Sequence, residues 1–222
     1  MPGRIDPSLI PASPDISIES ALWSNQIALV AGLDEAGRGA WAGPVVAAAV
    51  VLPQNPEIEH KLKGVRDSKE LTPAKRVEMA SMIQQHALAY AVGQADNEEI
   101  DQMGILPATR LAMARAITKL SGIPEHLLID ALFLPEIDIP QTTLIKGDQR
   151  SLSIAAASIL AKTTRDALMT QYHTDYSAYG FERHKGYGTR LHQQRLAEHG
   201  PCSLHRMSYA PLQENKSKTP KR

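Results

Sequence analysis

Only one cysteine, Cys202, occurs in this chain of 222 residues. A single cysteine excludes an internal disulfide and a metal site built from clustered cysteines, as expected in a reducing compartment. Pro201 beside it indicates a turn and nothing nearby marks an activated thiolate, so a structural role is favoured over a nucleophilic one. The histidines also lack the paired spacing with an adjacent Glu that is typical of zinc ligands.

Long apolar runs are absent as well. No segment approaches the roughly 20 apolar residues that span a bilayer, so we expect no membrane partner. Residues 1–24 show neither the basic start nor the apolar core of a secretory signal, which predicts a cytoplasmic protein. With 43% hydrophobic residues, the chain can still bury a sizeable core.

The chain also carries no net charge, because 24 Lys and Arg balance 24 Asp and Glu. The balance hides an asymmetry: residues 1–145 carry 11 Lys and Arg against 18 Asp and Glu, and residues 146–222 carry 13 against 6. A basic part beside an acidic site suits a polyanionic substrate, because cations contact its backbone while carboxylates hold metal. A chance imbalance of surface charge would give the same numbers.

The sequence does contain a pair of acids close to a glycine-flanked arginine: Asp34, Glu35, Gly37, Arg38 and Gly39. The apolar run 26–33 predicts a buried strand that delivers both acids to its end, and residues 44–52 predict the neighbouring strand. Glycines let backbone N–H groups approach a phosphate or sugar, and arginine fits phosphate oxygens. The pattern indicates a metal-dependent site for phosphodiesters, although a solvated strand end with a glycine-shaped hairpin is an equal alternative.

Further elements predict an α/β domain with a mixed central sheet flanked by helices and a helical C-terminal part. We expect helices over 72–86, 106–120 and 152–172, a further helix start at Asn97, and strands over 88–95, 127–130 and 142–145. Residues 1–25 are predicted to be an N-terminal extension and residues 213–222 a disordered basic tail, which leaves 26–212 as the domain.

Acids stand at three strand ends: Asp34 with Glu35, Asp130, and Asp148 after a glycine turn. If these ends converge, four carboxylates could hold Mg²⁺ or Mn²⁺, and two such ions roughly 4 Å apart activate water and stabilise a leaving oxygen. Taken singly, Asp130 could be a turn residue and Asp148 a cap for the helix that begins near Ser151.

From about residue 29 to residue 212, the chain resembles the ribonuclease HII family at one motif after another. The matching segments are Gly-Leu-Asp-Glu-Ala-Gly-Arg-Gly at 32–39, Asp-Ser-Lys at 67–69, residues 100–113, Leu-Ile-Asp at 128–130, Lys-Gly-Asp at 146–148, residues 153–162, Thr-Arg-Asp at 164–166, Tyr-Gly-Phe at 179–181, His-Lys-Gly-Tyr-Gly-Thr at 184–189 and His-Gly-Pro at 199–201. The resemblance implies a ribonuclease H-like fold, with 26–212 as its catalytic domain.

The resemblance also implies a role for individual residues. The acids that match Asp34, Glu35, Asp130 and Asp148 hold divalent metal and support hydrolysis in that family. Its Gly-Arg-Gly, here 37–39, reads the 2′-hydroxyl at the junction between ribonucleotide and deoxyribonucleotide, the group that separates RNA from DNA.

The tyrosine that matches Tyr187 packs against the sugar on the DNA side of the junction; a partly buried surface tyrosine is the alternative. Lys69 and Lys185 are expected to contact substrate, ahead of three further candidate cations at Lys146, Lys162 and Arg165.

Two departures from the family pattern affect local loop shape. Ala131 follows Asp130 where the family usually has glycine, and Ala40-Trp41 follows the Gly-Arg-Gly where Pro-Leu is common. Neither removes a functional atom.

The resulting prediction is a metal-dependent endoribonuclease that hydrolyses RNA in RNA-DNA hybrids and cuts 5′ to ribonucleotides embedded in duplex DNA. We expect Mn²⁺ or Mg²⁺ as cofactor and a monomer with no obligate protein partner. A resolvase of branched DNA on the same fold, which would cut all-deoxyribose junctions, and a non-catalytic binder of hybrid duplexes remain as alternatives.

Overall fold

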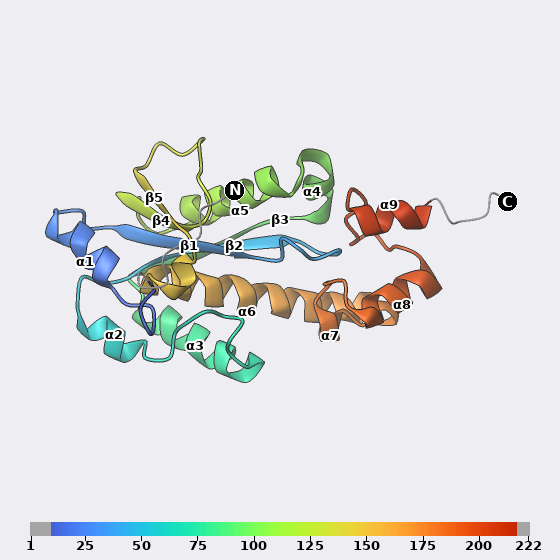
Figure 1. The fold of residues 1–222 in the computed structure, drawn as a ribbon, viewed down its shortest axis with the longest axis horizontal. Helices are drawn as coiled ribbons and strands as arrows, with labels where there is room; N and C mark the ends of the chain where they lie inside the picture. Colours follow the sequence, from blue (N-terminus) through green and yellow to red (C-terminus); the bar gives the residue numbers. More distant parts are fainter. Residues whose placement is uncertain (1–9, 217–222) are drawn as a thin grey trace.

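A computed structural model describes residues 10–216, which form a five-stranded mixed sheet in the order β3-β2-β1-β4-β5 (Figure 1). The strands are β1 (Val30–Ala36), β2 (Val45–Val51), β3 (Ala89–Ala95), β4 (His126–Asp130) and β5 (Gln141–Leu144). β1, β2 and β3 pair antiparallel, whereas β4 runs parallel to both β1 and β5. The central strand is therefore β1, which carries the adjacent acids.

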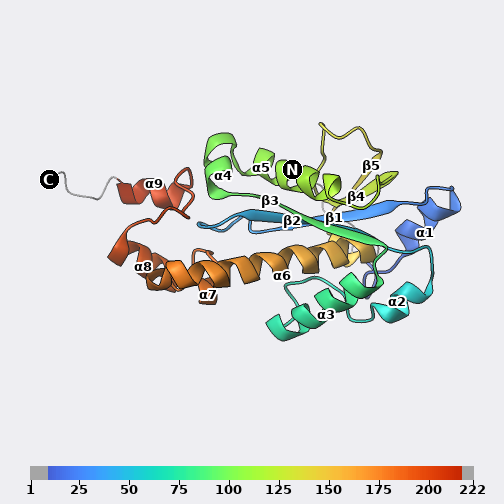
Figure 2. The ribbon, with the colours of Figure 1, turned by 180° about the vertical axis from the view of Figure 1, so that it is seen from behind.

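Helices cover both faces of this sheet. They are α1 (Ser17–Ser24), α2 (Glu57–Lys61), α3 (Pro73–His86), α4 (Asn97–Met103), α5 (Ile105–Thr118), α6 (Leu152–Asp175), α7 (Phe181–His184), α8 (Arg190–His199) and α9 (Ala210–Lys216). The views from the front and from behind agree that α5 lies on one face, that α6 lies on the other, and that α3 lies beyond α6 (Figures 1 and 2). The predicted mixed α/β architecture with a helical C-terminal part is confirmed.

The long helix α6 packs unusually close to β1. A Cβ atom built on Gly32 would lie 2.2 Å from the backbone of Ser153, so only glycine permits this approach. All seven residues of β2 are buried as well, because α5 and α6 cover its two faces, and small residues dominate its centre. The close approach holds the start of α6 against the strand that carries the acids.

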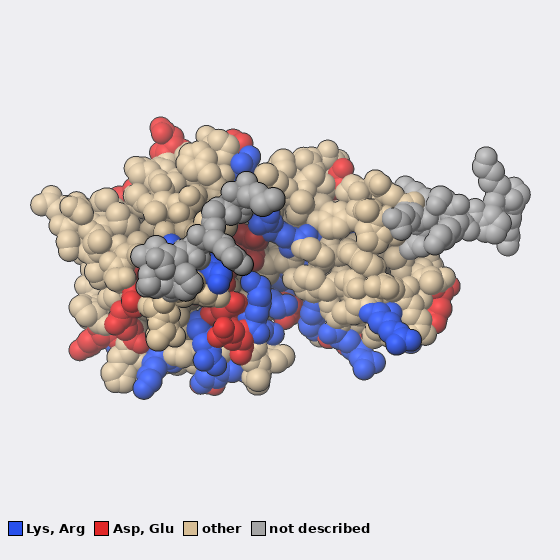
Figure 3. Space-filling model, viewed as in Figure 1, with Lys and Arg blue, Asp and Glu red and all other residues tan. Residues whose placement is uncertain are grey.

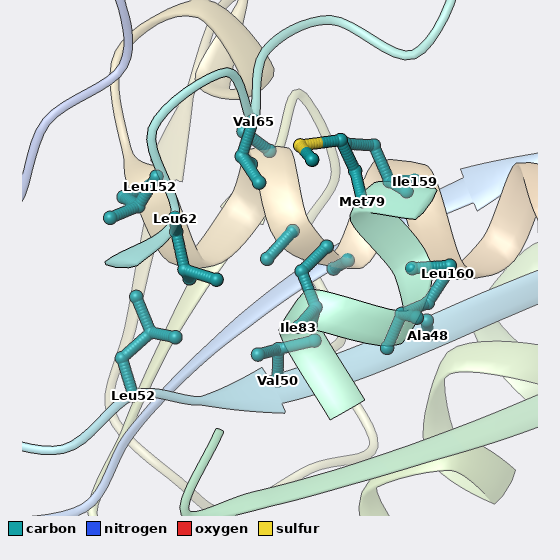
Figure 4. Packing of buried hydrophobic residues seen from close by; sticks show 14 of the residues in the cluster. Ala48, Val50, Leu52, Leu62, Val65, Met79, Ile83, Leu152, Ile159 and Leu160 are labelled. Carbon is teal, nitrogen blue, oxygen red and sulfur yellow. The ribbon is translucent and has the colours of Figure 1, made fainter. Parts of the chain in front are cut away.

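The core on the α6 side joins α2, α3, α6 and the sheet (Figure 4). Val50 and Leu52 of the β2 region meet Ile83 of α3 and Leu160 of α6, and all four are at most 2% exposed. Burial of side chains of this size contributes about 1.5–3 kcal/mol each relative to exposure. This packing fixes α6 and hence every side chain that α6 directs toward the acids.

Local signals in the sequence set several helix ends. The Thr72 side chain accepts a hydrogen bond from the N–H of Lys75 at the start of α3, as expected for an N-cap before proline. Asp96, rather than Asn97, caps α4 through a capping box with Glu99. Gly104, at φ +86°, then separates α4 from α5.

The described part of the predicted N-terminal extension is packed on the domain. Ile16 belongs to the core beside α3 and α6, and Glu19 is fully buried. One Glu19 oxygen accepts hydrogen bonds from the hydroxyls of Ser151 and Ser153, both at 2.6 Å, at the beginning of α6. A boundary at residue 25 therefore cuts through a packed segment, and residues 1–9 lie outside the description.

The predicted disordered tail at 213–222 overlaps a helix, since α9 continues to Lys216. Residues 217–222 lie outside the description. Within residues 10–216, no helix is both long and apolar enough to cross a bilayer.

Candidate active site

Two parallel neighbouring strands bring three of the predicted acids to one edge of the sheet. Leu33 of β1 is in register with Ile129 of β4, so Asp34 and Asp130 follow at the same level. Asp34 is 5% exposed and accepts a hydrogen bond from the Ser158 hydroxyl of α6. Glu35 is the next residue of β1, and repulsion from its carboxylate acts on Asp34. β1 continues to Ala36, so these acids lie within its last three residues.

The fourth acid, Asp148, reaches this edge through the turn that follows β5. The N–H of Gly147 donates to Asp130 Oδ1 at 2.7 Å, which ties the turn to the end of β4. A Cβ atom on Gly147 would lie 2.7 Å from Ile154 Cδ1, so a larger residue would require the end of the Ile154 side chain to shift. Asp148 itself is buried at 5% exposure.

The pKa of each of these four carboxylates is raised above its usual value, first of all by burial. Burial and then repulsion from Glu35 and Asp130 raise the pKa of Asp34 well above its usual value. Burial, followed by repulsion from Asp130 and Asp67, raises the pKa of Asp148 to about 6. Burial raises the pKa of Asp130 and of Glu35 too, although Arg38 opposes the shift at Glu35. A buried acidic group with perturbed pKa values is typical of a functional site.

The donor chemistry of this group fits a hard divalent cation. Glu35 Oε2 is buried without a hydrogen-bond partner among residues 10–216, while Oε1 of the same residue accepts from Arg38 Nη1 at 3.1 Å. A cation bound by oxygen ligands would offset both the unpaired oxygen and the mutual repulsion. Among residues 10–216, no three His, Cys, Asp or Glu side chains are gathered closely enough to hold an ion as they stand.

The ammonium group of Lys69 faces the acids from the loop between α2 and α3. Burial lowers the pKa of Lys69, but attraction to Asp67, Asp148, Asp34 and Asp130 outweighs that effect and raises the pKa. Nζ lies 4.0 Å from Asp67 Oδ1. The structure therefore brings the predicted Lys69 to the site together with an acid, Asp67, that was not predicted to take part.

A cavity of about 390 Å³ opens beside the acids and gathers most of the predicted substrate-contacting residues. Its lining consists of Glu35, Ala36, Gly37, Arg38, Gly39, Ser68, Lys69, Ser158, Lys162 and Tyr187. In the described part of the chain, the N–H groups of Arg38 and Gly39 have no acceptor and remain free to donate. Basic and acidic side chains together line the middle of the molecule on the face seen in Figure 3.

The ammonium of Lys185 lies elsewhere. It donates to Thr170 Oγ1 and to the carbonyl of Glu182, each at 2.6 Å, and borders a separate groove between α3, α6 and α7. The sequence motif is matched, but the left-handed backbone of Lys185 at φ +53° turns this side chain away from the acids. Lys185 therefore lies outside the cavity beside the acids, and its contact with substrate stays a prediction.

Tyr187 lines the cavity, and its backbone carbonyl contacts the first of two neighbouring histidines. His192 Nδ1 donates to the Tyr187 carbonyl at 3.0 Å, and His192 Nε2 lies 3.0 Å from His205 Nε2. Burial lowers the pKa of both histidines to about 4, so both are neutral at pH 7 and can form this chain of hydrogen bonds. On the open side, Lys162 Nζ lies 5.4 Å from the centre of the Tyr187 ring.

Arg165, one of the candidate cations, is fully buried and cannot contact a phosphate. Its guanidinium donates to the carbonyls of Ala42, Pro44 and Lys185. It thereby joins the loop after β1 to the loop that carries Tyr187. The sequence indicated a site-orienting cation or a phosphate ligand, and the buried position excludes the second.

No role in the site was predicted for Ser68 or Ser158, although both residues line the cavity. Their hydroxyl groups lie 3.0 Å apart, and Ser158 also holds Asp34. The signal was present, because Ser158 interrupts an otherwise apolar run in α6 and Ser68 stands between Asp67 and Lys69.

Ala131, which departs from the family's glycine, adopts φ +48° directly after Asp130. A left-handed backbone costs a residue with a Cβ roughly 1–2 kcal/mol. We therefore expect Ala131→Gly to raise the free energy of unfolding by about 1 kcal/mol, measured by urea denaturation. Ala114→Gly in the middle of α5 should lower it by about the same amount. A loss of stability in Ala131→Gly would contradict the strain argument.

The raised pKa of Asp148 predicts that the difference in stability between the wild type and Asp148→Asn depends on pH. Because the folded-state pKa exceeds the usual value of 3.8, protonation favours the folded state, and this stability is lost as pH rises through about 6. In EDTA, Asp148→Asn should match the wild type below about pH 4 and exceed its unfolding free energy by about 3 kcal/mol at pH 8. A stability difference between Asp148→Asn and the wild type that stays constant over this pH range would contradict the shift.

Comparison with known proteins agrees with the residue pattern. The sequence model of the family described as "Ribonuclease HII" matches residues 31–212. The chain is 52% identical over 204 residues to ribonuclease HII from Chloroflexus aurantiacus, covering 90% of this chain and 95% of that protein.

Solved structures show the same fold. The ribonuclease H2 from Pyrococcus horikoshii superposes with a TM-score of 0.70 at 26% identity and covers 86% of this chain and 98% of that one. The ribonuclease HII of Archaeoglobus fulgidus, solved in complex with PCNA, gives a TM-score of 0.68 at 27% identity over 82% and 95% of the two chains.

Proposed function

This chain belongs to the ribonuclease HII family, and we propose that it hydrolyses the RNA strand of RNA-DNA hybrids and incises 5′ to ribonucleotides embedded in duplex DNA. One observation carries the proposal. Buried carboxylates from three chain segments face each other beside a cavity lined by Gly37, Arg38, Gly39 and Tyr187. Cleavage should leave a 3′-hydroxyl and a 5′-phosphate, with no covalent enzyme intermediate.

The four acids Asp34, Glu35, Asp130 and Asp148 would hold Mg²⁺ or Mn²⁺, and Asp34, which lies between Glu35 and Asp130, would be shared if two ions bind. Such ions, when bound, activate water and offset negative charge on the phosphate. Their oxygen ligands come from rigid elements, since β1 and β4 are hydrogen bonded to each other and Gly147 is hydrogen bonded to Asp130. The protein thus supplies a preorganised anionic site.

The cavity wall would orient the substrate beside these acids. The N–H groups of Arg38 and Gly39 are available to the 2′-hydroxyl, a group that accepts and donates hydrogen bonds. The Arg38 guanidinium, with 45% of its side chain exposed, is placed to approach a backbone phosphate. Tyr187 offers a ring face to the adjacent sugar, and Lys69 supplies positive charge near the acids.

We infer that the enzyme acts as a monomer without an obligate protein partner. The single cysteine suits the reducing cytoplasm, where we place the enzyme. The PCNA complex is a property of the archaeal relative.

The deciding experiment compares two labelled duplexes that differ only in one nucleotide, ribose in one and deoxyribose in the other. With Mg²⁺, we expect cleavage 5′ to the ribonucleotide alone, and EDTA should abolish it. Equal cleavage of the all-DNA duplex would favour a resolvase, and tight binding without cleavage would favour a non-catalytic binder. Either result would overturn the proposal.

A further inference from the structure

The segment 205–209, between α8 and α9, folds back beneath the Gly-Arg-Gly loop. Arg206 is fully buried, and its Nη1 donates to the carbonyl of Arg38 at 2.9 Å while Nε donates to the carbonyl of Gly43 at 3.0 Å. The hydroxyl of Tyr209 donates to the same Arg38 carbonyl at 2.7 Å. Two side chains, more than 160 positions away in sequence, therefore hold one peptide oxygen of this loop.

That oxygen determines the direction of an N–H group in the cavity. The carbonyl of Arg38 and the N–H of Gly39 belong to one planar trans peptide, in which they point in opposite directions. With the carbonyl held inward by Arg206 and Tyr209, the Gly39 N–H is directed away from the core. Gly39 lines the cavity, and a Cβ built on it would have no neighbour within 4 Å. Among the described residues the Gly39 N–H has no acceptor, so it is free to donate to a ligand in the cavity.

The guanidinium of Arg206 serves this loop rather than an acid. In the described residues it forms no salt bridge, and its hydrogen-bond partners are two loop carbonyls and the Tyr209 hydroxyl. A buried cation without a carboxylate is unfavourable unless its donors are used. Nε and Nη1 of Arg206 are used by the loop, whereas Nη2 is buried with no hydrogen-bond partner among the described residues. Asp101 of α4 anchors the segment, because its carboxylate accepts from the N–H groups of Met207 and Ser208. The support beneath the loop is therefore itself fixed to the domain.

We propose that Arg206 and Tyr209 are positioning residues for recognition of the 2′-hydroxyl: through the Arg38 carbonyl they aim the Gly39 N–H at the ribose of the substrate. The inference rests on the proposed function and adds the residues that set its selectivity. Neither residue touches the substrate. Loss of either should reduce the cleavage of ribonucleotide-containing duplex while leaving general affinity for duplex DNA intact.

Tyr209→Phe is the cleanest test, because it removes one hydroxyl and retains the ring. We expect kcat/KM on the single-ribonucleotide duplex to fall about fivefold, the effect of one net hydrogen bond. The dissociation constant for the all-DNA duplex, measured by anisotropy in Mg²⁺, should stay unchanged. Tyr176→Phe is the matched control, since the Tyr176 hydroxyl pairs with Ser203 and not with the loop. It should leave both quantities at wild-type values.

Arg206→Lys gives a second, larger perturbation, and we expect kcat/KM to fall about tenfold or more because a lysine cannot donate to two carbonyls in parallel. In the double variant, the two losses should be non-additive, since both act on one carbonyl. Equal losses of ribonucleotide cleavage and DNA affinity, or wild-type kinetics in Tyr209→Phe, would overturn the inference. A wild-type enzyme that does not cut the ribonucleotide duplex would instead overturn the proposed function.

Discussion

Asp34→Asn should lower the rate of ribonucleotide-dependent cleavage about a thousandfold or more at saturating Mg²⁺, because loss of a central metal ligand removes several kcal/mol of transition-state stabilisation. Burial, followed by repulsion from Glu35 and Asp130, raises the pKa of Asp34. The amide keeps the size of the side chain and its hydrogen bond with Ser158. Single-turnover cleavage of the single-ribonucleotide duplex measures the effect.

A stability measurement separates this loss from misfolding. Without metal, the buried carboxylate of Asp34 is unfavourable at neutral pH, so Asp34→Asn should unfold at higher urea concentration than the wild type in EDTA. Addition of Mg²⁺ should stabilise the wild type and leave the variant unchanged. Retained activity, or a variant less stable than the wild type in EDTA, would show that Asp34 is not part of a metal-binding acidic group.

Gly37→Ala should destabilise the protein by about 2–4 kcal/mol and reduce cleavage roughly a hundredfold, from backbone strain together with overpacking. Gly37 adopts φ +97°, and a Cβ there would lie 2.0 Å from Arg165 Nε. That guanidinium cannot move aside, because it is fully buried and its three donors hold the carbonyls of Ala42, Pro44 and Lys185. Urea denaturation and kcat/KM on the ribonucleotide duplex measure the two losses.

Gly39, in the same loop, provides the control for Gly37→Ala. Gly39→Ala adds the same methyl group two residues away, where no atom lies within 4 Å, so the free energy of unfolding should stay within about 0.5 kcal/mol of wild type. Its cleavage rate should still fall, because the methyl group enters the cavity. If both variants are equally stable, the close approach of Arg165 to Gly37 does not exist in solution.

Patterns of short range in the sequence predicted most of the fold. The apolar run before Asp34, the Thr72-Pro73 start of α3 and the polar turn before α6 each act within a few residues, and the structure has the expected element at each place. The sequence missed how residues 10–25 pack. The buried partner of Glu19 is more than 130 residues away, and no local pattern reveals such a pair.

The residues of the candidate site also fall into two groups: those that short motifs identify and those that only long-range contacts bring together. Its acids, its Gly-Arg-Gly loop and its tyrosine could be found from the sequence because each stands in a short motif at a predicted strand end or turn. Ser158, Asp67 and the Arg206–Tyr209 support could not, because their part in the site depends on what α6 and the C-terminal segment contact. Lys185 shows the converse case, since its motif matches but its ammonium contacts Thr170 and does not line the cavity.

The amino-acid sequence therefore establishes which chemistry is available to the protein, namely which carboxylates, glycines and cations exist and which local elements carry them. The tertiary structure alone decided which of these groups meet. Side-chain direction depends on packing between elements distant in the chain, as when Gly32 lets α6 approach β1 and when two buried arginines hold the loop after β1. Such contacts arise from the free energy of the whole fold, and no window of neighbouring residues contains them.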